Sequence, residues 1–321
     1  MNLKNKNSCL LNSALFFSTM GSTATTLGFI TYIFNTTHSP FNTGAVTIAT
    51  LLVGMLLGPF LGILVKEKGL MWSMVVPEIV SSFILLIFIF IDNLYLVYII
   101  AFLIGFNNKI LGIARLSFIP NITNDLVKFN ALLRSINRFA LISGSLLFSV
   151  IINYSLTLVF VIDAITYIIS AYLLYRLNKN VRIQSHFLNK KINFIVYLGI
   201  LARIFYMCIP ILLLIFIKDT LHLSDSQYGY TQTISRLASF IVFGILAKYF
   251  TINLATSFKK ILFPLFILYG VSIFCIGYIK TIEQLYILYS IYMWTGDNYK
   301  HSYYNRLYSI KPRKIDFMII I

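Results

Sequence analysis

Residues 71–91 read MWSMVVPEIVSSFILLIFIFI, a run of apolar side chains in which Glu78 is the single charged residue. About 20 consecutive apolar residues in an α-helix cross the roughly 30 Å hydrocarbon core of a bilayer. A surface helix of a soluble domain would need a polar face instead. This stretch therefore predicts a transmembrane helix.

Comparable runs recur along the whole chain. They predict ten transmembrane helices, over residues 10–34, 43–65, 71–91, 94–118, 131–153, 156–176, 194–217, 227–249, 258–279 and 284–304. The composition agrees, because 59% of the 321 residues are hydrophobic and 11% are charged, against about a quarter charged in a soluble domain. The sequence thus predicts an all-α integral membrane protein.

The net charge of +16 would suggest nucleic acid in a soluble chain, but here the basic residues lie mainly between the apolar runs. With the N-terminus in the cytoplasm, most lysines and arginines fall in cytoplasmic segments, and the outside loops hold only Lys218 and Lys280. Positive charge of this kind marks the cytoplasmic side. We expect a multi-pass protein of the cell (plasma) membrane with both termini cytoplasmic, the lipid bilayer as a partner, and no nucleic-acid partner.

The longest internal loop divides the chain. It predicts an N-terminal six-helix bundle at 1–176, a basic cytoplasmic linker at 177–193, and a C-terminal bundle of about four helices at 194–321. The sequence Gly62-Ile-Leu-Val-Lys66 returns as Gly244-Ile-Leu-Ala-Lys248, 182 residues later. Parallel six-helix repeats build one large class of transporters. By this offset an eleventh helix would begin near residue 313, so we expect an incomplete second half.

Several short motifs resemble one family in order and spacing. They are Met20-Gly21-Ser22, Leu57-Gly58-Pro59-Phe60-Leu61-Gly62, Ser117-Phe-Ile-Pro120, Val161-Ile-Asp163-Ala164 and Lys218-Asp219-Thr-Leu221. Together they resemble the major facilitator superfamily, and within it the bacterial drug exporters that include macrolide efflux and enterobactin export proteins. The resemblance implies a secondary active transporter that uses no cofactor. Such a transporter would export a small amphipathic substrate by alternating access, as a monomer, with protons as the coupling ion.

The loop after the second helix departs from the family pattern Gly-x-x-x-Asp-Arg-x-Gly-Arg-Arg. Both glycines remain, as Gly62 and Gly69, but Lys66 and Glu67 replace the Asp-Arg pair and the two arginines are missing. The resemblance makes these four residues the candidates for a conformational loop. Two other interpretations stay open: a truncated, inactive remnant of a transporter, and a membrane scaffold or membrane enzyme.

Charged residues inside apolar spans are expensive and therefore suggest function. A carboxylate in a dry site can take up and release a proton, so the candidates for transport and proton coupling are Glu78, Asp163, Arg138 and Arg134. The candidates for lining a cavity are Asn107, Lys109, Arg115, Arg203 and Arg236. The alternative for each charged residue is structural pairing or snorkelling to the interface, and for Asp163 we favour a structural role.

The sequence shows no motif of a catalytic or metal site. The stretches GxxxxGK[ST], HExxH and GxSxG are missing, and the four histidines are scattered over loops and one helix end. Each of these motifs places reacting or ligating groups at a fixed spacing. We therefore expect no enzymatic activity, no metal and no cofactor.

Overall fold

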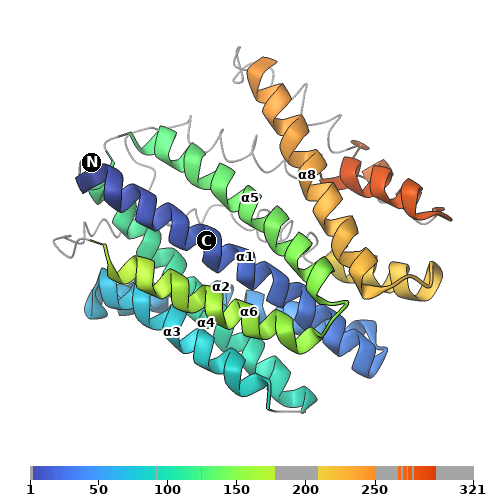
Figure 1. Cartoon of the computed structure of the whole chain (residues 1–321), viewed down its shortest axis with the longest axis horizontal. Helices are drawn as coiled ribbons and strands as arrows, with labels where there is room; N and C mark the ends of the chain where they lie inside the picture. The colour runs from blue at the N-terminus through green and yellow to red at the C-terminus, as the bar shows by residue number, and fades with distance from the viewer. Residues whose placement is uncertain are drawn as a thin grey trace. The chain divides into compact units, whose positions relative to one another are not determined.

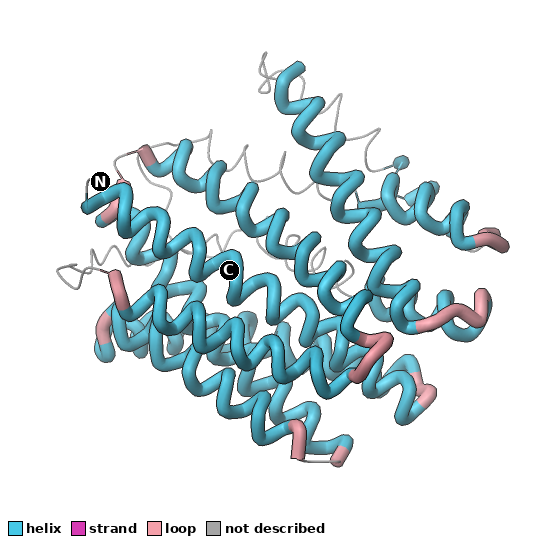
Figure 2. Tube along the Cα trace, in the orientation of Figure 1, coloured by secondary structure: helices cyan, strands magenta, loops and turns pink. Residues whose placement is uncertain are grey.

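The computed structural model describes residues 3–90, 93–123, 125–177, 209–249, 278–293 and parts of 267–276. Within these ranges the regular structure is entirely helical. Helices are the expected result in a bilayer, where each backbone polar group must be satisfied inside its own segment. The predicted all-α class is confirmed (Figure 2).

The first six predicted spans correspond to six long helices. Their bounds are α1 Leu3–Thr37, α2 Pro40–Lys68, α3 Leu70–Phe88, α4 Leu94–Phe118, α5 Leu126–Ile151 and α6 Leu156–Tyr175. A short 3-10 turn, η1 at Ile119–Asn121, follows α4, and α8 runs over Asp225–Tyr249 after the π-helical turn η2 at Phe216–Thr220. Among the described residues, the segments 70–88, 95–121, 129–151 and 156–175 are long and apolar enough to cross a membrane.

Some predictions fall partly or wholly on other residues. The linker 177–193 lies outside the described residues except for Leu177, and so do most of the seventh and ninth predicted spans and the second half of the tenth. The described chain separates into two compact units, one ending at Phe216 and one beginning at Ile217. The predicted domain bounds at 176 and 194 stay a prediction.

Helices α1 to α6 form the N-terminal bundle. In it α1 packs between α5 and α6 and also touches α2, α3 packs against α4 and α6, and α2 packs against α4 (Figure 1). Two glycines let α5 and α6 approach α1 closely. A Cβ on Gly21 of α1 would overlap side-chain oxygens of α6, and a Cβ on Gly144 of α5 would overlap the carbonyl oxygen of Met20.

The interior of this bundle is stratified along its length. One apolar cluster includes Leu11, Met74, Phe118 and Leu174. A second includes Phe29, Phe88 and Phe160, whose rings contact one another at centroid distances of 4.9–5.4 Å. Between the two clusters the same helices place buried polar side chains. These form what we call the polar layer: Ser18, Thr25, Glu78, Ser81, Ser82, Asn107, Asp163, Thr166 and Ser170.

The turn between α2 and α3 depends on glycine. Gly69 has φ 86° and ψ 157°, a conformation essentially restricted to glycine. Its N–H donates to the Val65 carbonyl at 3.1 Å and its carbonyl accepts from Ser73 N at 3.1 Å, so one residue both ends α2 and begins α3.

Gly69→Ala should therefore lower the free energy of unfolding by about 1–3 kcal/mol, because the methyl group strains this backbone. Gly112→Ala in α4 is the matched control, since nothing lies within 4 Å of its Cβ position and helical alanine is favoured over glycine by about 0.5–1 kcal/mol. Thermal unfolding of the purified variants measures both. Equal midpoints for the two variants would contradict the turn's dependence on Gly69.

The second unit begins with a turn that repeats the one between α1 and α2. His38 (φ 46°) precedes Ser39 and α2, and His222 (φ 52°) is soon followed by Ser224 and α8. Both histidines have the left-handed conformation that commonly ends a helix. Their separation of 184 residues lies close to the 182-residue offset of the sequence repeat, which supports an internal duplication.

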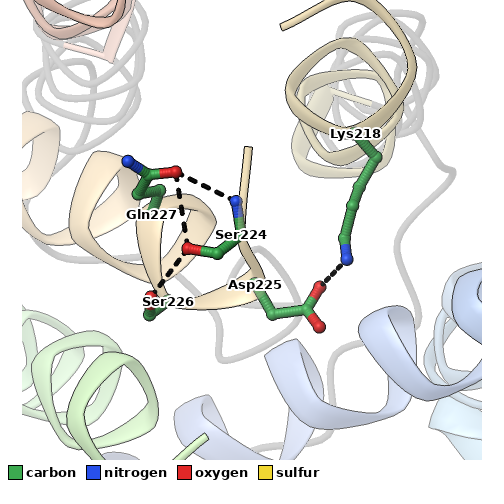
Figure 3. Close-up of polar contacts among 5 residues, drawn as sticks. All are labelled: Lys218, Ser224, Asp225, Ser226 and Gln227. Atoms are coloured by element: carbon green, nitrogen blue, oxygen red, sulfur yellow. Dashed lines mark hydrogen bonds and ion pairs between the residues drawn. The ribbon is translucent and has the colours of Figure 1, made fainter. Parts of the chain in front are cut away.

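One half of a capping box starts α8 (Figure 3). Gln227 Oε1 accepts from Ser224 N at 2.9 Å, the reciprocal half of the Ser-x-x-Gln capping pattern. Asp225 in the first turn pairs with Lys218 Nζ at 2.7 Å, and its negative charge suits the positive end of the helix dipole. These contacts fix the entry into α8 for the buried polar residues further along it.

Candidate functional site

The polar layer holds the buried carboxylates of the described chain. Glu78 in α3 is 1% exposed and Asp163 in α6 is fully buried. Both were predicted as transport candidates from their position inside apolar runs. A buried polar group has to be satisfied by partners, and a buried charge needs even more compensation. The surroundings of the two carboxylates differ in this respect.

Glu78 is surrounded by three other helices. Ser170 Oγ of α6 donates to Glu78 Oε1 at 2.9 Å, and Ser18 of α1 hydrogen-bonds to the same carboxylate. Ser170 Oγ also lies 3.2 Å from the carbonyl oxygen of Ala14, so one hydroxyl links α1, α3 and α6. The guanidinium of Arg115 in α4 interacts electrostatically with Glu78.

The pairing of Glu78 with Arg115 leaves several atoms without a hydrogen bond to any described residue. They are Glu78 Oε2 and the Nε and Nη2 atoms of Arg115. The two charges thus compensate each other through space rather than through a tight salt bridge. Such a pair is easily changed by protonation of the carboxylate, because no direct bond has to break.

Asp163 has hydroxyl partners instead of a cation. Thr166 Oγ1 lies 3.0 Å from Asp163 Oδ1 and 2.8 Å from the Asp163 carbonyl oxygen, and Thr25 of α1 interacts with the carboxylate. The missing side chain of Gly21 makes room for the carboxylate against α1. Asp163 Oδ2 has no hydrogen-bond partner among the described residues.

Further hydrogen bonds tie the polar layer together. Asn107 Nδ2 of α4 donates to Ser81 Oγ of α3 at 3.1 Å, and Ser82 Oγ of α3 donates to the Ala164 carbonyl of α6 at 2.9 Å. Asn108 lies near the Tyr167 hydroxyl, which makes no well-aligned hydrogen bond to a described residue. The predicted cavity candidate Asn107 therefore lies inside the bundle, bonded between helices.

The other predicted residues lie elsewhere. On α5, Arg134 is exposed and Arg138 is half-buried. Lys109 on α4 and Arg236 on α8 are half-buried, and both have interaction partners. Arg203 lies outside the described residues. At the end of α2, Lys66 and Glu67 are exposed and Gly62 and Gly69 are half-buried.

Sequence reasoning missed the hydroxyl residues of the layer. Ser170 and Thr166 carry no charge and drew no attention, although residues 163, 166 and 170 share one face of a helix by their spacing. It also missed a buried polar group in the second unit, where Gln232 Nε2 donates to Tyr289 Oη at 3.2 Å and Tyr289 stacks on Tyr292. The helical period was the available signal in both places.

Comparisons with known proteins agree on the kind of molecule. The family model described as Major Facilitator Superfamily matches residues 11–296. No curated protein matches the sequence significantly.

Solved structures share the fold at low identity. A variant of the nucleoside transporter NupG is 14% identical with a TM-score of 0.72, over 99% of this chain and 85% of that one. A bacterial homologue of the iron transporter ferroportin in an inward-facing state is 16% identical with a TM-score of 0.66, over 98% and 86%. An inward-facing, unoccupied bacterial homologue of the human lysosomal transporter Spinster is 12% identical with a TM-score of 0.61, over 95% and 75%.

Proposed function

This chain belongs to the major facilitator superfamily, a family of membrane transporters, and on that premise we propose that it couples proton uptake at Glu78 to the export of a small amphipathic molecule. The carrying observation is the loosely compensated carboxylate of Glu78, buried between α1, α4 and α6. Family membership supports transport rather than catalysis.

The proposed cycle follows from the contacts of Glu78. While ionised, its carboxylate compensates Arg115 and accepts from Ser170. When it takes up a proton, the attraction to Arg115 is lost and a new O–H donor must find an acceptor. Because the affected groups lie on four helices of one bundle, a change in protonation changes how these helices hold together. In alternating access, one bundle moves against the other around the substrate. A change in how the helices of one bundle hold together can therefore drive transport.

The proposed direction of transport and orientation in the membrane are inferred from the sequence. The resemblance of the motifs to drug exporters supports the direction of transport, and the excess of lysine and arginine in one set of loops supports cytoplasmic termini in the cell membrane. We propose a monomer that handles a small-molecule substrate, with Asp163 in a structural role. Lys66, Glu67, Gly62 and Gly69 form the conformational loop in this proposal.

Dye accumulation in cells tests the export and its coupling. Cells that produce the chain should retain less of a fluorescent amphipathic cation than cells with an empty vector, and a protonophore should abolish the difference. Glu78→Gln should lose the protonophore-sensitive export, because an amide cannot carry the proton. The matched control is Glu283→Gln, the same chemical change at an exposed position.

Each part of the proposal has its own contradicting result. Export that persists with a protonophore would contradict proton coupling. Export by Glu78→Gln at the wild-type rate would contradict the role of Glu78. Equal dye retention with and without the chain, at confirmed levels in the membrane, would contradict export of that dye.

A further inference from the structure

We propose that Asp163, Thr25 and Thr166 form a binding site for a sodium ion between α1 and α6. This site is separate from the role of Glu78 and does not require that role. Among the described residues, the Asp163 carboxylate has hydroxyl partners and no compensating cation, and it lies where α1 and α6 approach each other closely.

The charge of the Asp163 carboxylate is not compensated by a cation among the described residues. The carboxylate is fully buried, and its stabilising partners among the described residues are hydroxyls, with no cationic side chain. The charged and titratable groups that do interact with it are Glu78 and Tyr167, and both are acids. Glu78 by contrast has Arg115. A buried carboxylate without a counter-charge is strongly unfavourable, so Asp163 takes up either a proton or a cation from outside the chain.

The alternative to a metal ion is a bound proton. A protonated Asp163 would carry its hydrogen on one carboxyl oxygen and would need an acceptor for it. Oδ2 has no hydrogen-bond partner of either kind among the described residues, and Thr166 already lies against Oδ1. A proton on Oδ1 could be accepted by Thr166 Oγ1, which lies within donating distance of the Asp163 carbonyl oxygen. Oδ2 would still lack a partner among the described residues, whereas a metal ion would use it as a ligand.

The neighbouring oxygens of the Asp163 carboxylate come from hydroxyl groups. The Thr25 hydroxyl interacts with the carboxylate but is buried and makes no well-aligned hydrogen bond to a described residue. Carboxylate and hydroxyl oxygens suit hard cations. One carboxylate balances one positive charge, which favours an alkali ion. The described residues contain no group of three or more His, Cys, Asp or Glu side chains that would suit another metal.

Gly21 lies where α1 meets the oxygens of Asp163 and Thr166 on α6. A Cβ at this position would overlap Thr166 Oγ1 and Asp163 Oδ1, so only glycine lets these α6 oxygens lie directly against α1. Thr25 lies one turn further along α1, on the same side of the helix. Oxygens of both helices thus converge on one buried point, and a bound ion would hold α1 and α6 together.

Thermal unfolding of the purified full chain tests the site without any transport substrate. At equal salt concentrations, sodium chloride should raise the midpoint by about 2 °C or more over choline chloride, because an ion that binds only the folded state stabilises it. Asp163→Asn should lose this sodium response. Glu78→Gln should keep it, since Arg115 already compensates Glu78.

A second measurement covers the case that Asp163→Asn does not fold. Radioactive sodium should bind the wild-type protein at about one ion per chain, and Thr25→Val should reduce that binding while keeping the side-chain volume. Equal midpoints of the wild-type protein in sodium and choline would overturn the proposal. So would sodium binding that is unchanged in both Asp163→Asn and Thr25→Val.

Discussion

Replacing Arg115 with methionine is expected to lower the free energy of unfolding by about 1–3 kcal/mol, the usual cost of leaving a buried polar group without its partner. The loss arises less from the missing attraction than from what remains. Glu78 would stay buried between α1, α4 and α6 with its charge uncompensated. The hydroxyls of Ser170 and Ser18 would be its remaining partners.

A second substitution separates this cause from a simple packing defect. Glu78→Gln in the Arg115→Met background removes the stranded charge and keeps an oxygen that can accept from Ser170. The double variant should therefore regain most of the stability lost in the single variant. If the double variant is less stable than Arg115→Met alone, the pairing of the two residues is wrong.

Arg134→Met is the matched control for this series. Arg134 is exposed on α5, and substitutions at exposed positions usually change stability by about 0.5 kcal/mol or less. Thermal or denaturant unfolding in one detergent compares the wild-type protein, the two single variants and the double variant directly. An equal loss in Arg134→Met and Arg115→Met would show that a general loss of positive charge, and not the interaction of Arg115 with Glu78, is responsible.

The helices of the N-terminal bundle could be predicted well from the sequence. The predicted span 94–118 coincides with α4, because a segment that crosses a bilayer must be apolar over a fixed length and helical throughout. The ends were less predictable. The first span was expected to begin at residue 10, yet α1 begins at Leu3, since a helix continues through polar residues such as Lys4 once it has left the hydrocarbon.

The candidate site could be predicted only in part. Charge inside an apolar run identified Glu78 and Asp163, because the cost of burying a charge is visible in the sequence. Their partners were not visible. Ser170 contacts Glu78 across 92 residues of sequence, and a serine inside a membrane helix is too ordinary to attract attention by itself. The difference between the two carboxylates, a cation for Glu78 and hydroxyls for Asp163, depends on which helices are neighbours.

The same holds for the two glycines beside α1. Gly21 belongs to the family-like motif Met20-Gly21-Ser22, and Gly144 lies within the fifth predicted span. The structure gives both a physical role, because each lets another helix approach α1 closely. Small residues are what close helix packing in a membrane requires.

Gly144→Leu is expected to prevent correct folding of the N-terminal bundle, and Gly144→Ala to lower the free energy of unfolding by about 1–3 kcal/mol. The Cβ of either residue would overlap the Met20 carbonyl oxygen and approach Thr23 Cβ to 2.8 Å. A backbone oxygen within a helix cannot turn aside as a side chain can, so α1 and α5 would have to separate. Size-exclusion profiles and unfolding midpoints of the purified variants measure the effect.

The position of the overlap gives the sharpest control. Met20→Ala removes a side chain but leaves the Met20 carbonyl oxygen in place, so it should not rescue Gly144→Ala, and the effects of the two substitutions should add. Gly44→Ala in α2 should be harmless by comparison, since nothing lies within 4 Å of its Cβ position. Rescue by Met20→Ala would mean that side-chain crowding, and not the approach of the two backbones, makes glycine necessary at position 144. The contact between α1 and α5 would then tolerate larger residues than the structure implies.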